Sequence, residues 1–320
     1  MNKNHITLGE SGETCTAMCK YGKAVEIYTK SSTFRIDSSG DTSMERIPWM
    51  ARKIRSIGSS NSIISRIFIQ SSNMIDGVLI LDQQVNRSKI IDHMHGIADK
   101  LLMCDETAVK LCLHISTICE SIQNEGIKQD GGGKFLNPFP CIENLERDCS
   151  QYLIEANRTA KAILEMPSLF GLTSSKGLKP ATVIGGLNPQ NDAVLIRMLK
   201  KFEPISTKIN DLRNHQGHTE TSETKISDFA LSHRLDINPP MWEIVGKTKY
   251  ESSLISEDIQ EFNKNLFHAA EGIFMHCLLS AATPKIPYVI ESIPDESIDL
   301  NCPVKYKLSI IESEIEQKAG

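Results

Sequence analysis

Two long segments of this chain carry apolar residues at the spacing of one helix face, so each needs another part of the protein to cover it. This spacing predicts helices over residues 142–166 and 257–282. Pro167 should end the first helix, and Ser256 is a suitable N-cap for the second. The apolar positions are Leu145, Cys149, Tyr152, Ala156, Ala160 and Ile163 in the first segment and Ile259, Phe262, Leu266, Ile273 and Cys277 in the second.

The front of the chain has a different pattern, rich in β-branched residues. Isoleucine outnumbers leucine by 39 to 26, with a concentration between residues 63 and 91, and β-branched side chains suit strands. Residues 63–82, IISRIFIQSSNMIDGVLILD, predict a β-hairpin around Asp76-Gly77, and residues 23–37 predict two short strands. Residues 88–103 predict a helix, whereas residues 108–122 fit a strand and a helix equally well.

These patterns predict an α+β protein with a β-rich N-terminal part followed by a mainly helical C-terminal part. The clearest break is the Gly-rich stretch at 130–134. We therefore expect a flexible arm over 1–22, a β-rich part over 23–130 and a mainly helical part over 131–320. One continuous domain is the alternative, because the sheet could need the later helices as cover.

Composition limits the class of protein. The chain has 320 residues, 40% of them apolar, and a formal net charge of -5. Its mean hydropathy is -0.22, and no run of apolar residues is long enough to cross a bilayer. The first residues lack the apolar core of a secretory signal, and there are nine cysteines, an odd number. We expect reduced, core-filling thiols in an intracellular protein, without a transmembrane segment.

The most suggestive polar feature is a short basic segment that contains one of the two tryptophans. Cations that hold phosphates beside an aromatic ring that stacks on a base are typical of single-stranded nucleic-acid binding. The alternative is the start of an amphipathic helix, with the tryptophan in the core and the cations in solvent. The candidate nucleic-acid-binding residues are Arg46, Trp49, Arg52, Lys53 and Arg55.

Other candidate chemistry is incomplete. The stretch Gly131–Lys134 is followed by Phe135 rather than Ser or Thr, so it fails as a phosphate loop and is typical of a linker. His215 and His218 flank a glycine and could serve a phosphate-chemistry enzyme, although the segment lacks an apolar strand pattern to hold them. His93 and His95 are close together, but the sequence lacks the two closely spaced Cys or His pairs that a structural zinc site usually has. We therefore expect no catalytic residue, no metal and no cofactor.

One segment resembles plant-virus movement proteins of the thirty-K superfamily. The residues are Arg66-Ile-Phe-Ile-Gln followed by Asp76-Gly-Val-Leu-Ile-Leu-Asp82, in which Gly77 and Asp82 match the family's glycine and aspartate. Where the family often has a basic residue, two positions after the aspartate, this chain has Gln84. The resemblance implies a jelly-roll-like domain, cooperative binding of single-stranded nucleic acid and action at the channels between plant cells. Asp82 would then fix a strand end rather than catalyse.

The composition also resembles that of nonstructural proteins of segmented RNA viruses, which build cytoplasmic factories or tubules by self-association. The leading interpretation is a non-enzymatic viral nonstructural protein that binds single-stranded RNA and supports movement or replication. The alternatives are a self-assembling factory (viroplasm) or tubule protein that uses Phe262 and Leu266 for self-association, and the phosphate-chemistry enzyme. Expected partners are RNA, further copies of the chain, and a viral nucleoprotein or host channel proteins. The expected location is the host cytoplasm, at cell junctions or in inclusions.

Overall fold

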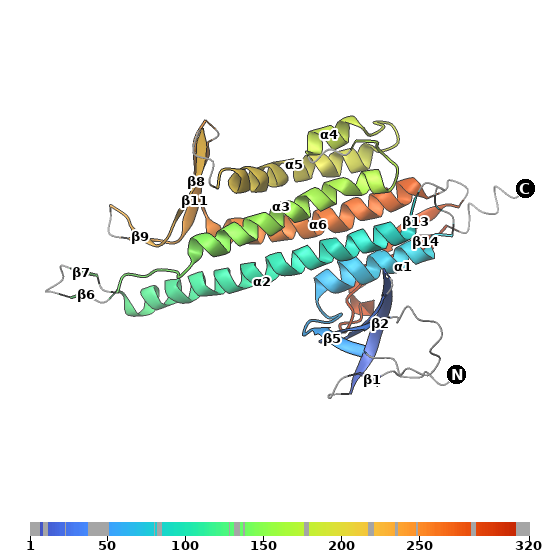
Figure 1. Ribbon diagram of the computed structural model, residues 1–320, viewed down its shortest axis with the longest axis horizontal. Helices are drawn as coiled ribbons and strands as arrows, with labels where there is room; N and C mark the ends of the chain where they lie inside the picture. Colours follow the sequence, from blue (N-terminus) through green and yellow to red (C-terminus); the bar gives the residue numbers. More distant parts are fainter. Residues whose placement is uncertain are drawn as a thin grey trace, which may run out of the picture. The chain divides into compact units, whose positions relative to one another are not determined.

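The structure is a computed structural model, and the α+β class is confirmed (Figure 1). The residues that it describes are 7–8, 12–22, 24–37, 51–79, 81, 85–127, 129–130, 135–136, 138–175, 179–216, 221–233, 236–247, 249–282 and 286–311. None of the described helices combines the length and apolar character that a bilayer crossing requires.

The N-terminal region forms a five-stranded antiparallel sheet in which each strand pairs with the next along the chain. The strands are β1 (Thr7–Leu8), β2 (Glu13–Tyr21), β3 (Ala24–Thr29), β4 (Thr33–Asp37) and β5 (Ala51–Arg55). The two strands predicted over 23–37 are confirmed as β3 and β4. The flexible arm predicted over 1–22 is wrong where β2 pairs with β3. The consecutive strand order is a meander, without the Greek-key order of a jelly roll.

The hairpin predicted over 63–82 is wrong, because its first part is helical. Residues Ile63–Ile69 form a π-helix, η1, and Gln70–Gly77 continue as α1. Gly77 ends α1, and Asp82 lies outside the described residues. The isoleucines here fill a core from a helix, so tertiary packing overrides their preference for strands. The buried apolar side chains are Ile63, Ile64, Ile67, Phe68, Ile69, Met74 and Ile75.

The ambiguous segment 108–122 belongs to one long helix, α2, which runs from Arg87 to Glu125. The side chain of Asn86 accepts a hydrogen bond from the backbone N–H of Lys89, as an N-cap does. The helix predicted over 88–103 is therefore confirmed and continues for about six more turns, to Glu125. Its buried positions Leu111 and Ile115 are four residues apart, as one face of a helix requires.

Both long amphipathic helices are confirmed. They are α3 (Leu145–Leu169), which continues two residues past Pro167, and α6 (Ile255–Ala281), which begins one residue before Ser256. Between them lie α4 (Pro180–Gly185) and α5 (Ala193–Asn214). All eleven apolar positions named for the two stripes are buried. Hydrophobic periodicity was therefore sufficient to place these two helices and their buried faces.

The part predicted as mainly helical also contains strands. A three-stranded sheet has the order β12 (Tyr250–Leu254), β11 (Met241–Gly246), β8 (Ser222–Ser227). Three antiparallel pairs complete the described strands: β6 (Gln129–Asp130) with β7 (Phe135–Leu136), β9 (Ala230–Leu231) with β10 (Ile237–Asn238), and β13 (Tyr288–Ser292) with β14 (Tyr306–Ile310). A short 3₁₀ helix, η2 (Asp295–Ser297), separates β13 from β14.

The described chain divides into two compact units, each built from separate segments. Unit 1 comprises residues 1–99, 162–201 and 267–320, and unit 2 comprises residues 100–161 and 202–266. The predicted boundary near residue 130 is not one of these division points, and residues 131–134 lie outside the described residues. Each of α2, α3, α5 and α6 contributes residues to both units.

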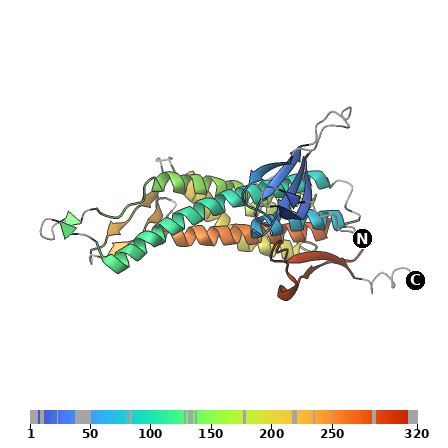
Figure 2. The same cartoon turned by 90° about the horizontal axis from the view of Figure 1, so that it is seen from below.

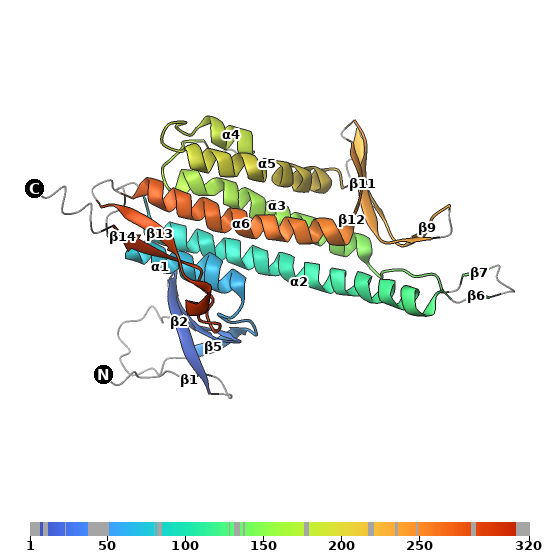
Figure 3. The same ribbon diagram turned by 180° about the vertical axis from the view of Figure 1, so that it is seen from behind.

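In unit 1 the N-terminal sheet lies against α1 and the first part of α2, residues 87–99 (Figure 2). The C-terminal pair β13–β14 lies beside α1 (Figure 3). Gln70 of α1 links this strand pair to the helix, because the side-chain oxygen of Gln70 accepts hydrogen bonds from the backbone N–H groups of Lys305 (2.9 Å) and Tyr306 (2.8 Å). The end of the chain's described part is thereby fixed to the helical core of this unit.

Candidate nucleic-acid interface

The predicted basic segment is a strand at the edge of the N-terminal sheet. β5 pairs with β4 on one side, and the sheet's strand order ends with it. The register places Arg52 opposite Arg35, Lys53 opposite Phe34 and Arg55 opposite Thr33. Arg52 and Arg55 therefore lie on the face of the sheet that carries Glu26 and Tyr28, and Lys53 lies on the other face. The alternative of an amphipathic helix over these residues is wrong.

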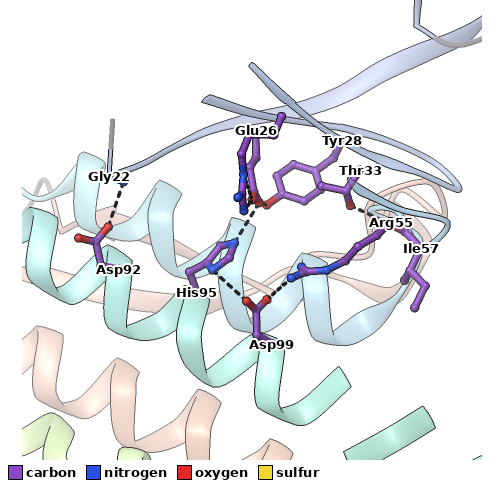
Figure 4. A network of polar contacts seen from close by, with 10 residues as sticks. Gly22, Glu26, Tyr28, Thr33, Arg55, Ile57, Asp92, His95 and Asp99 are labelled. Carbon is purple, nitrogen blue, oxygen red and sulfur yellow. Dashed lines mark hydrogen bonds and ion pairs between the residues drawn. The ribbon is translucent and has the colours of Figure 1, made fainter. Parts of the chain in front are cut away.

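The face with Glu26 holds a buried polar network (Figure 4). Glu26 is fully buried, and its carboxylate accepts hydrogen bonds from Arg35 Nη2 (2.6 Å) and Tyr28 Oη (2.5 Å) and contacts His95 Nε2 (3.0 Å). Burial alone would raise the pKa of this carboxyl, but the contacts with His95, Tyr28 and Arg35 outweigh it and lower the pKa to about 2. Glu26 is therefore ionised at neutral pH.

The network continues along α2. His95 Nδ1 lies 3.5 Å from Asp99 Oδ2, and Arg55 Nη2 lies 2.7 Å from Asp99 Oδ1. About one helical turn before His95, the side chain of Asp92 accepts a hydrogen bond of 3.1 Å from the backbone N–H of Gly22. These contacts attach the turn between β2 and β3, and the strands β3 and β5, to one helix, as Figure 4 shows.

The π-helix η1 supplies the apolar wall of this network. The ring of Phe68 meets the ring of His95 edge-on, with 4.8 Å between centroids, and also meets Tyr28 at 6.2 Å. π-helical turns are rare and are frequently found at functional sites. Because Glu26, Tyr28 and His95 are at most 2% exposed, the cluster stabilises the sheet on the helix rather than presenting groups to a substrate.

Two of the cations of β5 remain exposed to solvent. Arg52 and Lys53 are exposed, and within the described residues neither has an ion pair or a hydrogen bond from its side chain. Hydrogen bonds from Ser31 and Thr29 lower the pKa of the Glu13 carboxyl, and Lys53 adds a smaller effect through space. Arg46 and Trp49 lie outside the described residues. The structure thus leaves Arg52 and Lys53 exposed on opposite faces of the edge strand and pairs Arg55 with Asp99.

The cross-strand pair Arg35–Arg52 has an unbalanced charge. Directly opposed residues on neighbouring strands have Cβ atoms about 5 Å apart, and like charges there destabilise the pair. Glu26 neutralises Arg35, whereas Arg52 has no such carboxylate among the described residues. An anion bound at Arg52 would relieve this repulsion. The described aromatic rings of the sheet, Tyr28 and Phe34, are buried, so they cannot stack on a base.

The residues predicted for self-association are in the core of unit 2. Phe262 and Leu266 have no exposed surface. The ring of Phe262 stacks on that of Trp242 with 6.1 Å between centroids. Trp242 in turn donates a hydrogen bond of 2.6 Å from Nε1 to Asp258. The prediction that Phe262 and Leu266 form a contact surface is therefore wrong, because the apolar stripe of α6 is covered within its own chain.

Within the described residues, the structure adds no support for catalysis or metal binding by the histidine and cysteine candidates. His215 follows α5 and its backbone carbonyl accepts a hydrogen bond from Thr224, while His218 lies outside the described residues. Within the described ranges, no three His, Cys, Asp or Glu side chains are placed to share a metal ion. All nine cysteines are free thiols. Burial raises the pKa of Cys104 and Cys149 to about 12, which makes these thiols poor nucleophiles.

Sequence reasoning missed the Glu26 network. Its one local signal is the spacing of His95 and Asp99, four residues apart and so on one helix face. Nothing in the sequence indicates that β3 would lie against that face. No protein-family model, curated protein or solved structure matches this chain.

Proposed function

We propose that this chain is a non-enzymatic viral nonstructural protein that binds single-stranded RNA along the edge strand β5. The observation that carries the proposal is that, within the described part of the chain, two of the four cations on β4 and β5 form ion pairs with carboxylates and the other two do not. Arg35 and Arg55 form ion pairs with carboxylates, whereas Arg52 and Lys53 are exposed at the edge without an ion pair among the described residues. Lys53 has only a weaker attraction through space to the Glu13 carboxylate. Exposed cations without an ion pair are the groups that phosphates neutralise.

The contact would favour phosphates over bases. The sheet's described aromatic rings are buried, so binding relies on charge and carries little sequence preference. When a single-stranded RNA makes two phosphate contacts, a plot of the logarithm of the association constant against the logarithm of the salt concentration has a slope of about -1.4. Affinity through β5 alone is therefore modest and strongly weakened by salt.

The viral role is supported by composition. The resemblance to movement proteins adds little support, because it depends on strands around Gly77, whereas the residues up to Gly77 are helical. A role in replication in the host cytoplasm therefore agrees better with the fold than the jelly-roll architecture of the movement proteins does. The self-assembly alternative loses its proposed surface, since Phe262 and Leu266 are buried.

The test is RNA affinity measured by fluorescence anisotropy across a salt series. A mixed-sequence single strand is titrated with the wild type, with Arg52→Ala/Lys53→Ala, and with the control Lys225→Ala/Lys264→Ala. The control removes the same two charges at exposed positions of unit 2. We expect the β5 variant to lose affinity and to reduce the salt slope by about 1.4. Equal behaviour of the β5 variant and the control would overturn the proposal.

A further inference from the structure

A second cluster of exposed cations lies on α5. Arg197, Lys200 and Lys201 are exposed at positions i, i+3 and i+4, so they share one face of the helix. Like charges at this spacing destabilise an isolated helix by several tenths of a kcal/mol. Within the described residues, none of the three forms an ion pair with a carboxylate, although Glu203 is three residues beyond Lys200 and so lies near it on the helix. Glu203 offsets part of the repulsion, and three cations beside one carboxylate still leave this face with a net positive charge.

The helix holds these cations on a rigid support. Leu195 and Leu199 are buried on the opposite face. Met198 packs on Gly272 of α6 so closely that a Cβ atom at Gly272 would lie 2.2 Å from the Met198 methyl carbon. Burial, and then the Arg197 guanidinium, lower the pKa of His276 on α6, so that this imidazole is neutral at pH 7 and leaves the charge of the cluster unchanged.

Within unit 1, the α5 cluster and β5 belong to different layers. β5 is part of the sheet that His95 of α2 contacts, whereas this part of α5 packs on α6. Figures 1 and 3 show the part of α5 that belongs to unit 1, residues 193–201, and β5 on opposite sides of the helices of this unit. A strand of RNA bound along one of these faces leaves the other face free, so two strands could be held at once.

We propose that the face of α5 formed by Arg197, Lys200 and Lys201 is a second binding site for single-stranded RNA, and that the protein bridges two RNA strands. This inference rests on the proposed function of β5. An anionic membrane is the less suitable partner, because membrane-surface helices insert large apolar side chains. Here the leucines are buried, and Val194 is the one large apolar residue of α5 that is exposed.

Bridging is tested with two short RNAs of roughly ten nucleotides, within the footprint of one site. One RNA is immobilised, the other is fluorescent and free, and the protein is used at a concentration at which mass photometry shows a monomer. We expect the wild type to retain the fluorescent strand on the immobilised one. Lys200→Ala/Lys201→Ala should still bind the immobilised strand within about twofold but should lose most of the bridging, while Lys225→Ala/Lys264→Ala should bridge like the wild type.

The outcomes separate the two proposals. If the wild type binds the first strand but never retains the second, or if the α5 variant bridges normally, the second site is refuted and the β5 proposal stands. If no strand binds at all, the proposed function itself fails. Flotation with phosphatidylserine vesicles is the remaining arm. Loss of vesicle binding in the α5 variant, with RNA bridging unchanged, would refute the RNA site in favour of a membrane contact.

Discussion

Each of the two units contains a buried carboxylate that joins a sheet to a helix, and the partners of the two carboxylates differ. In unit 1, Glu26 of β3 is held by Arg35, Tyr28 and the imidazole of His95. In unit 2, Asp258 of α6 accepts hydrogen bonds from Trp242 (2.6 Å), Ser253 (2.6 Å) and Lys208 (2.8 Å). Both arrangements satisfy a buried charge with several donors, as burial of a carboxylate requires.

The two carboxylates differ in how far their networks of contacts extend. Glu26 belongs to a chain of charged groups that continues through His95 and Asp99 to Arg55, so several strands depend on it. Asp258 has two neutral donors and one cation, and within the described residues no further charged group extends this cluster. We therefore expect unit 1 to be the more sensitive to loss of its carboxylate and to acid.

The largest expected effect is that of Glu26→Ala. Removal of this carboxylate leaves Arg35 and the buried His95 without their shared partner, and such losses cost about 3–5 kcal/mol. The free energy of unfolding is measured by urea denaturation. Because the variant can fail to fold, Glu26→Gln is measured beside it; its amide oxygen still accepts one hydrogen bond, so a smaller loss is expected.

Hydrogen exchange assigns that loss to a region. Glu26→Ala should speed exchange of the backbone amides in β2, β3 and β4, while those in β8 and β11 stay protected. A loss below about 1 kcal/mol, or equal deprotection of both sheets, would contradict the idea that Glu26 organises unit 1.

The second effect is acid sensitivity. The pKa of Glu26 is lowered from an ordinary 4.5 to about 2, so the unfolded state takes up a proton first as pH falls. The stabilisation is complete above about pH 4.5 and is lost between there and about pH 2, a change of roughly 3 kcal/mol. The difference in unfolding free energy between the wild type and Glu26→Gln should shrink by that amount. For the exposed control Gln123→Ala the difference should not change with pH.

The third effect is that of Asp258→Ala, for which we expect a loss of about 2 kcal/mol. The buried Trp242 Nε1 and the Ser253 hydroxyl lose their acceptor, and a buried donor left without one costs about 1–3 kcal/mol. Urea denaturation gives the free energy, and hydrogen exchange should rise in β11 and β12 rather than in β3. A loss larger than that of Glu26→Ala would reverse the proposed order of the two units.

The fold was predictable from the sequence where apolar periodicity was long and unambiguous. The stripes of α3 and α6 were sufficient, and all their apolar positions are buried. The same reasoning failed over 63–77, because isoleucine has a preference for strands that contacts from distant segments override. Arg66 and Gln70 of this region contact Glu271, about two hundred positions away, and local sequence carries no sign of it.

The candidate site was predictable only in part. Four cations and a tryptophan in ten residues pointed to the right segment, but a strand rather than a helix presents the described cations. Which cations stay exposed depends on pairing between β4 and β5 and on α2 supplying Asp99 to Arg55. The sheet register and the packing of the sheet on a helix decide this, and neither is encoded in the basic segment itself.

The smallest expected effect concerns Arg55, where the network of unit 1 meets the proposed RNA contact. Its ion pair with Asp99 is partly exposed, with 29% and 35% of the two side chains accessible, so Arg55→Ala should cost less than about 1 kcal/mol. Because Asp99 already neutralises Arg55, RNA affinity should stay within about twofold of the wild type, whereas Arg52→Ala should lower it clearly. Anisotropy titrations of both single variants at about 0.1 M salt make the comparison. If Arg55→Ala weakens RNA binding as much as Arg52→Ala, the ion pair with Asp99 must open on binding, and the division between structural and RNA-binding cations would be wrong.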